Sequence, residues 1–80
     1  MRILLVEDEV ELARWVTRAL EQGGFVIEHV TDGLKAEARL MAEEYDAVVL
    51  DLRLPGKDGL AVLKAMRGRD DRTPVLILTA

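Results

Sequence analysis

The 80-residue sequence contains no cysteine, so neither a disulfide framework nor a zinc site built on thiolates can form. Long apolar runs are also missing: stretches such as Val75–Leu78 stop at four residues, whereas a membrane-spanning helix needs about 20. The early run Ile3–Val6 is too short for the core of a signal peptide, and acidic residues follow it at once. We therefore expect a cytoplasmic protein that does not enter a membrane.

Positive charge is the scarcer sign. The chain has 11 Lys and Arg against 15 Asp and Glu, a formal net charge of −4, which disfavours non-specific binding to nucleic acid. Apolar residues make up 50% of the chain and charged residues 32%, a balance typical of a folded protein and not of a disordered one. A chain of this length forms one domain, and it buries only about 60% of the surface that it exposes when unfolded.

Four short apolar runs are predicted to be β-strands. The run that contains Glu28 and His29 is less apolar than the others, so we expect it at an edge of the sheet. Continuous apolar runs are typical of strands buried on both faces of a parallel sheet. The predicted strands are Ile3–Val6, Phe25–Val30, Ala47–Leu50 (followed directly by Asp51) and Val75–Leu78.

The segments between these strands have helical spacing of apolar residues. Gly23 and Gly24 end the first helix, the second begins at Asp32 and Gly33 and ends near Glu44, and Asp58 caps the third, which Gly68 ends. We expect Trp15 to pack in the core, and Met41 and Met66 to fill gaps there. The predicted core-facing residues are Leu12, Trp15, Val16, Ala19 and Leu20, then Leu34, Ala38 and Met41, then Leu60, Leu63 and Met66.

Strands that alternate with helices predict an α/β fold with a parallel sheet and helices on both faces. The order of elements is β-α-β-α-β-α-β. Right-handed crossovers reduce the number of possible topologies, but the pattern alone does not fix the order of the strands in the sheet.

Acidic residues follow two of the buried strands directly: Glu7 and Asp8 after the first, and Asp51 after the third. Ligand sites of open parallel sheets lie at the carboxyl ends of the strands, so these carboxylates converge if the first and third strands are neighbours. Such a cluster must be protonated, well solvated or bound to a cation, and Mg²⁺ or Mn²⁺ suits its oxygen ligands. The simpler alternative is that the three acids are solvated loop residues.

Chemistry beyond metal binding is also possible at this edge. An aspartate beside a divalent cation can attack a phosphoryl group and form an aspartyl phosphate. Thr79 follows the fourth strand and offers a hydroxyl that could contact a phosphoryl oxygen, while Ala80 leaves space beside it.

Three motifs together resemble the receiver domain of two-component response regulators. They are Val6-Glu7-Asp8-Glu9, the segment Val49–Gly59 that contains Asp51 and Pro55-Gly56-Lys57-Asp58, and Pro74–Ala80. The resemblance extends over residues 1–80 and is strongest to the subfamily whose receivers precede a winged-helix DNA-binding domain. It implies a flavodoxin-like, doubly wound sheet with strand order 2-1-3-4-5.

The resemblance also implies a role for each site residue. Asp51 would be the phosphoacceptor, Glu7 and Asp8 would hold Mg²⁺, and the backbone carbonyl of Arg53 would be a further metal ligand. Thr79 would be the switch hydroxyl and Ala80 the small residue beside the phosphoryl group. The implied partners are a sensor histidine kinase and, through an output domain outside this chain, DNA.

A complete receiver domain continues with a fourth helix, a fifth strand and a fifth helix. The family's phosphate-contacting Lys and aromatic switch residue lie in that part, and Lys35, Lys57 and Lys64 do not match the position of the Lys. The sequence is thus interpreted as a receiver that is incomplete after the fourth strand. Because the fourth strand would then be an unpaired edge, we expect a homodimer or larger assembly.

A receiver is a signalling module whose chemistry is limited to its own phosphorylation and dephosphorylation, and three other classes of function are alternatives to it. A magnesium-dependent phosphatase with an aspartyl nucleophile usually has a second acid two residues later, where Arg53 stands. A dinucleotide-binding domain would need a glycine-rich turn after the first strand, where acids stand instead. An inactive structural fragment is the remaining alternative. His29 lies within a strand, so we expect a structural role for it and not a role as a phosphocarrier.

Overall fold

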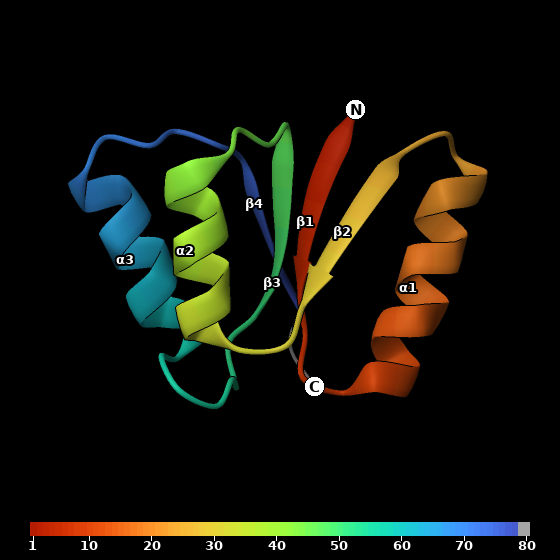
Figure 1. Cartoon of the computed structure of the whole chain (residues 1–80), viewed down its shortest axis with the longest axis horizontal. Helices are drawn as coiled ribbons and strands as arrows, with labels where there is room; N and C mark the ends of the chain where they lie inside the picture. Colours follow the sequence, from red (N-terminus) through yellow and green to blue (C-terminus); the bar gives the residue numbers. More distant parts are fainter. Residues whose placement is uncertain (79–80) are drawn as a thin grey trace.

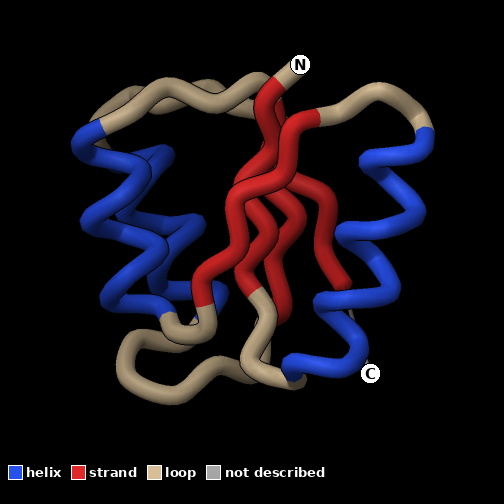
Figure 2. Tube along the Cα trace, turned by 45° about the vertical axis from the view of Figure 1, so that its right-hand side comes forward, coloured by secondary structure: helices blue, strands red, loops and turns tan. Residues whose placement is uncertain are grey.

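A parallel sheet of four strands forms the centre of the protein in a computed structural model that describes residues 1–78. The strands lie in the order β2-β1-β3-β4. Helix α1 covers one face of the sheet, and α2 and α3 cover the other (Figures 1 and 2). The elements are β1 (Arg2–Val6), α1 (Val10–Gln22), β2 (Val26–Val30), α2 (Gly33–Ala42), β3 (Ala47–Asp51), α3 (Gly59–Gly68) and β4 (Val75–Leu78).

This topology confirms the α/β class and, for the four strands described, the order 2-1-3-4 that the family resemblance implies, with β2 at one edge as expected. Strand boundaries agree with the prediction to within one residue. The local signals behave as expected as well. Gly24 has φ +91 just beyond α1, a conformation that residues with a Cβ rarely adopt. Asp32 and Asp58 cap α2 and α3 by accepting the backbone N–H groups of Lys35 and Ala61.

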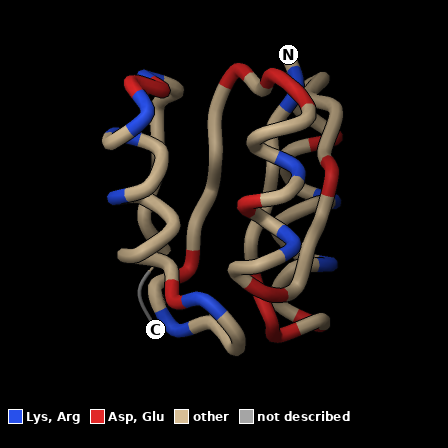
Figure 3. The backbone as a smooth tube through the Cα atoms, turned by 60° about the vertical axis from the view of Figure 1, so that its left-hand side comes forward, with Lys and Arg blue, Asp and Glu red and all other residues tan. Residues whose placement is uncertain are grey.

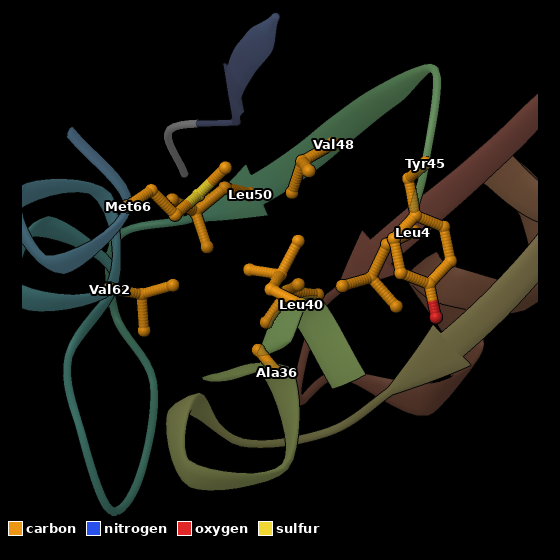
Figure 4. Packing of buried hydrophobic residues seen from close by; sticks show 9 residues of the cluster. Leu4, Ala36, Leu40, Tyr45, Val48, Leu50, Val62 and Met66 are labelled. Carbon is orange, nitrogen blue, oxygen red and sulfur yellow. The ribbon is translucent and has the colours of Figure 1, made fainter. Parts of the chain in front are cut away.

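The core has two parts, one on each face of the sheet. Side chains from α2 and α3 point towards those of the strands in the larger cluster (Figure 4), which consists of Leu4, Val6, Ala36, Leu40, Tyr45, Val48, Leu50, Val62 and Met66. The smaller cluster lies under α1 and consists of Ile3, Leu5, Ala13 and Val49. Because Leu4 and Val6 point to one face, Ile3 and Leu5 to the other, β1 is buried on both faces, as its apolar run predicts.

The predicted core face of α2 is wrong. Leu34, Ala38 and Met41 are exposed, and the buried stripe is Gly33, Ala36 and Leu40. Both sets have helical spacing, so periodicity alone could not separate them. The two ion pairs flank the buried stripe: Glu37 pairs with Lys57 on one side of it, and Arg39 pairs with Glu28 of β2 on the other.

The predicted core positions of α1 and α3 are partly wrong. Trp15 is 70% exposed and does not pack in the core, and Leu12 and Ala19 are exposed as well. Ala13, which the prediction omitted, is the buried residue of α1, and Val16 and Leu20 pack beside it. In α3, Met66 is buried as expected and Leu63 partly so, but Leu60 is exposed and Val62 takes its place. Met41 fills no gap in the core.

Candidate functional site

The carboxyl ends of β1 and β3 bring three acids together. The two strands are paired, with Val6 opposite Leu50, so Glu7 and Asp51 follow at neighbouring positions. Glu7 is 3% exposed and Asp51 is 7% exposed, whereas Asp8 is open to solvent. Carboxylate oxygens of the three residues lie within 4.8 Å of one another. Figure 3 shows acidic segments at this end of the molecule, and others at the opposite end.

The electrostatics of this cluster are unfavourable to three ionised acids. Burial raises the pKa of Glu7, and the neighbouring Asp51 carboxyl raises it further, partly offset by the N–H of Glu9, which donates to Glu7 Oε2 at 3.0 Å. In residues 1–78 every ion pair lies elsewhere, so no Lys or Arg there is paired with an acid of the cluster. A bound cation would stabilise the ionised form of such a group of acids.

The donor set fits a hard divalent cation. Carboxylate oxygens at this spacing, one of them exposed to water, match the preference of Mg²⁺ for oxygen ligands and retained water. The cluster lines a pocket of about 400 Å³ together with Leu12 and Val16 of α1, with Arg53, and with Leu78 at the end of β4. The pocket leaves room beside the acids for a hydrated ion and a small anionic group.

The loop that follows Asp51 is tied in place at several points. The N–H of Arg53 donates to Asp51 Oδ1 at 3.0 Å, which orients the carboxylate. The N–H of Gly33 donates to the carbonyl of Pro55 at 3.3 Å, and a Cβ at Gly33 would overlap the carbonyl oxygen of Lys57. The Lys57 side chain pairs with Glu37 of α2. The loop therefore rests directly on the start of α2.

Of the sequence-predicted site residues, the structure brings together Glu7, Asp8, Asp51 and Arg53. Thr79 and Ala80 lie outside the described residues. Sequence reasoning missed the tie between Gly33 and the loop after Asp51. It also missed His29, whose Nε2 lies 2.8 Å from the backbone carbonyl of Glu7. No local sequence signal could reveal either contact, because each joins segments whose adjacency depends on the strand order.

A model of the response regulator receiver domain matches residues 3–80. The chain belongs to this family. Among curated relatives, the transcriptional regulatory protein TctD of Salmonella typhimurium is 50% identical, and QseB of Escherichia coli O157:H7, also a transcriptional regulatory protein, is 44% identical. Both matches cover 100% of this chain and 36% of the relative, so the receiver-family chain spans about a third of the length of these proteins.

Solved structures agree with the family assignment. The receiver domain of the Francisella response regulator 1452 superposes with a TM-score of 0.95 at 30% identity, covering 99% of this chain and 65% of that one. The response regulator TrrA of Thermotoga maritima, solved in complex with Mg²⁺ and BeF, has a TM-score of 0.93 at 32% identity over 99% of this chain and 69% of that one. The receiver fold is thus present over the described residues.

None of the helices in the described part of this receiver chain has the length and apolar content that crossing a membrane requires.

Proposed function

We propose that this receiver domain accepts a phosphoryl group on Asp51. The observation that carries the proposal is the position of Asp51, a residue 7% exposed at the end of β3 whose carboxylate is clustered with those of Glu7 and Asp8. In the reaction with a phosphohistidine donor, an oxygen of Asp51 forms a bond to phosphorus while the bond between phosphorus and the histidine nitrogen breaks. That nitrogen keeps the electron pair and takes a proton. The Arg53 N–H holds the attacking carboxylate in one orientation.

Glu7, Asp8 and Asp51 would hold Mg²⁺, with the backbone carbonyl of Arg53 as a further ligand. The donor chemistry of the cluster and the raised pKa of Glu7 support this assignment. When bound, the ion neutralises negative charge on the carboxylates and on the incoming group. The structure of TrrA, which has this fold, was solved in complex with Mg²⁺ and BeF, and this supports the same assignment here.

The roles of Thr79 and Ala80 are part of the proposal. Thr79 would contact a phosphoryl oxygen through its hydroxyl and report the modification, and Ala80 would leave the space that the group needs. The position of Leu78 supports this, because it ends β4 and lines the pocket of the acid cluster.

We further propose that a sensor histidine kinase is the phosphoryl donor and that the module controls transcription through an output domain. The curated relatives support this, since they are transcriptional regulators about three times as long as the chain. DNA would be contacted by the output domain and not by the receiver, whose net charge is −4. Because regulators of transcription act where the chromosome is, the proposal places the domain in the cytoplasm.

The proposal is tested by incubating the chain with acetyl phosphate and Mg²⁺ and measuring the intact mass. We expect slow addition of one phosphoryl group to the wild type and none to Asp51→Ala. Labelling is expected to be slow because the 80 residues contain no Lys at the position that the family uses. Asp70→Asn is the matched control, since Asp70 is exposed and pairs with Arg72 away from the cluster.

If the phosphoryl group is added too slowly to measure, binding of a phosphoryl mimic provides a second test. Beryllofluoride, which imitates a phosphoryl group, should shift the backbone amides of Asp51 and its neighbours in the wild type and in Asp70→Asn. Stoichiometric labelling of Asp51→Ala would mean another acceptor. A wild type that shows neither labelling nor beryllofluoride shifts would overturn the proposal.

The 80-residue chain by itself is also proposed to self-associate. β4 pairs with β3 on one side, and the described residues contain no strand on its other side. Leu76 of β4 is 63% exposed, so an apolar edge with unpaired backbone groups is open to another chain. Sedimentation velocity should show a dimer or larger species at tens of micromolar, and Leu76→Lys should shift it towards monomer. A wild-type monomer at that concentration would contradict this part.

A further inference from the structure

Both the backbone N–H and the backbone carbonyl of Glu7 form hydrogen bonds with residues of β2. Its N–H donates to the carbonyl oxygen of Val30 at 3.1 Å, continuing the parallel pairing of β1 with β2. Its carbonyl oxygen lies 2.8 Å from Nε2 of His29. A carbonyl oxygen can only accept, so Nε2 of His29 carries the hydrogen in this contact. A side chain from the neighbouring strand thus completes the hydrogen bonding of this residue.

The contact falls where the regular ladder stops. In a parallel ladder the next partner of the Glu7 carbonyl would be a backbone N–H beyond Val30, but β2 ends there. The chain turns away at Thr31, and Asp32 is already the N-cap of α2. The imidazole of His29 therefore supplies the donor that the departing strand no longer provides.

The position of the imidazole also fits a role at the site. His29 is opposite Leu5 in the sheet, on the face that α1 covers. It is half-buried in a groove along α1 whose lining includes Val10, Thr17 and Glu21. On the same face, Glu7 lines the acid pocket beside Leu12 and Val16 of α1. His29 is therefore behind the carboxylate cluster, beside the backbone of one of its members and outside the pocket itself.

We propose that His29 is a positioning residue that holds the Glu7 peptide through Nε2–H, so that the Glu7 carboxylate stands against Asp8 and Asp51. The inference rests on the proposed function for the use of the cluster, but the geometry that it explains does not depend on bound metal. With its N–H, carbonyl and Oε2 all engaged, Glu7 has little freedom to relax away from the neighbouring acids. Partners that orient metal ligands typically affect metal affinity about 10- to 100-fold.

The test compares two replacements of similar size. His29→Gln keeps an N–H donor at about the reach of Nε2, whereas His29→Met keeps the bulk and removes the donor. Thr17→Val, in the same groove, is the control that does not touch Glu7. The first readout is the ¹³C shift of the Glu7 side-chain carboxyl in the metal-free chain. The second is the Mg²⁺ affinity measured from the amide shifts of Glu7, Asp8 and Asp51.

We expect the Glu7 carboxyl shift to move in His29→Met and to stay near the wild-type value in His29→Gln and Thr17→Val. Mg²⁺ affinity should fall roughly tenfold in His29→Met and change less than about threefold in the other two variants. The inference is overturned if His29→Met keeps the wild-type carboxyl shift, or if His29→Gln is impaired as much as His29→Met. A merely structural role would lower the stability of both variants without this difference between them.

The two readouts separate the inference from the function on which it rests. If the wild type does not bind Mg²⁺, the proposed function fails, and the metal-free carboxyl shift still decides whether His29 positions Glu7. If the wild type binds Mg²⁺ and all variants bind equally well, the inference fails while the proposed function stands.

Discussion

At the amino end of the sheet, Asp71 accepts hydrogen bonds from both the hydroxyl and the N–H of Thr73, at 2.6 and 3.0 Å. At the carboxyl end, Glu7 faces Asp51 with no cation paired to either among the described residues. The hydroxyl of Thr73 is the main reason that the pKa of Asp71 is lowered, whereas burial and then Asp51 raise the pKa of Glu7. A carboxylate is thus stabilised by hydrogen bonds at the amino end of the sheet and crowded by another carboxylate at the carboxyl end.

The rest of the amino end is satisfied in the same way. Asp46 accepts the N–H of Arg2 at 2.7 Å, and the Arg2 guanidinium lies over the ring of Tyr45. Arg67 donates to the backbone carbonyls of Asp71 and Thr73. These contacts close the ends of loops and need no ligand. The end at which the carboxylates crowd one another is the one at which an added cation relieves most repulsion, so the comparison supports the proposed role of Glu7 and Asp51.

The largest difference between the two ends should come from adding one methyl group. Gly33→Ala places a Cβ against the carbonyl of Lys57 and forces the loop after Asp51 to move, so the free energy of unfolding should fall by about 2 to 3 kcal/mol. Gly68→Ala, at the amino end, meets nothing within 4 Å and should raise stability by up to about 1 kcal/mol. Urea denaturation of both variants checks this, and equal effects would contradict it.

The next effect is a gain of stability at the crowded end. Asp51→Asn keeps an oxygen for the Arg53 N–H and removes a charge beside Glu7, so unfolding should cost about 1 to 2 kcal/mol more near neutral pH without divalent ions. Adding Mg²⁺ should reduce the difference, because the ion stabilises only the wild-type cluster well. Urea denaturation with and without Mg²⁺ measures both quantities. A destabilised Asp51→Asn would show that the acids do not repel one another.

The same substitution at the satisfied end should have the opposite sign. Asp71→Asn weakens two hydrogen bonds from Thr73 that are strengthened by the carboxylate charge, so stability should fall by about 1 kcal/mol near neutral pH. The matched measurement is urea denaturation under the conditions used for Asp51→Asn. If both Asp→Asn changes shifted stability in one direction, the contrast between the two ends would be wrong.

The smallest effect is the pH dependence of the loss at Asp71. Its pKa is lower in the folded protein than in the unfolded chain, where it is about 3.9. Its contribution is therefore fully present above that unfolded value and is lost as pH falls through the folded value. The stability difference between wild type and Asp71→Asn should be constant from neutral pH down to about pH 5 and shrink below about pH 4. If the stability difference between wild type and Asp71→Asn increased as the pH was lowered, the predicted direction of the pH dependence would be wrong.

The strands and the acid cluster could be predicted because their signals are local. Ile3–Val6 and Ala47–Leu50 are apolar on both faces, and an acid directly after such a strand must lie at the carboxyl end of the sheet. That the two strands are neighbours was not in the pattern and came from the family resemblance. The roles of Thr79 and Ala80 stay predictions, since these residues lie outside the described part of the chain.

The helix faces were harder because the sequence offers more apolar residues than the sheet can cover. In α2, Ala36 and Leu40 compete with Leu34 and Met41 at the same spacing, and the choice depends on the close approach of Gly33 to the loop of another element. Trp15 is apolar and well spaced, yet α1 presents the smaller Ala13 to the sheet. His29 could not be assigned to Glu7 because their contact depends on the register of β2 against β1 and on where β2 ends, neither of which a local pattern gives.

The direct pairing of β1 with β3, across an intervening helix, strand and second helix, has a kinetic consequence. Glu7 and Asp51 meet only when a long stretch of chain has closed and β3 has docked on β1, which has a cost in loop-closure entropy. An ion at the cluster would therefore recognise the finished sheet and not its precursors. We expect it to slow unfolding while leaving the refolding rate nearly unchanged, so that occupancy of the site lengthens the lifetime of the native state.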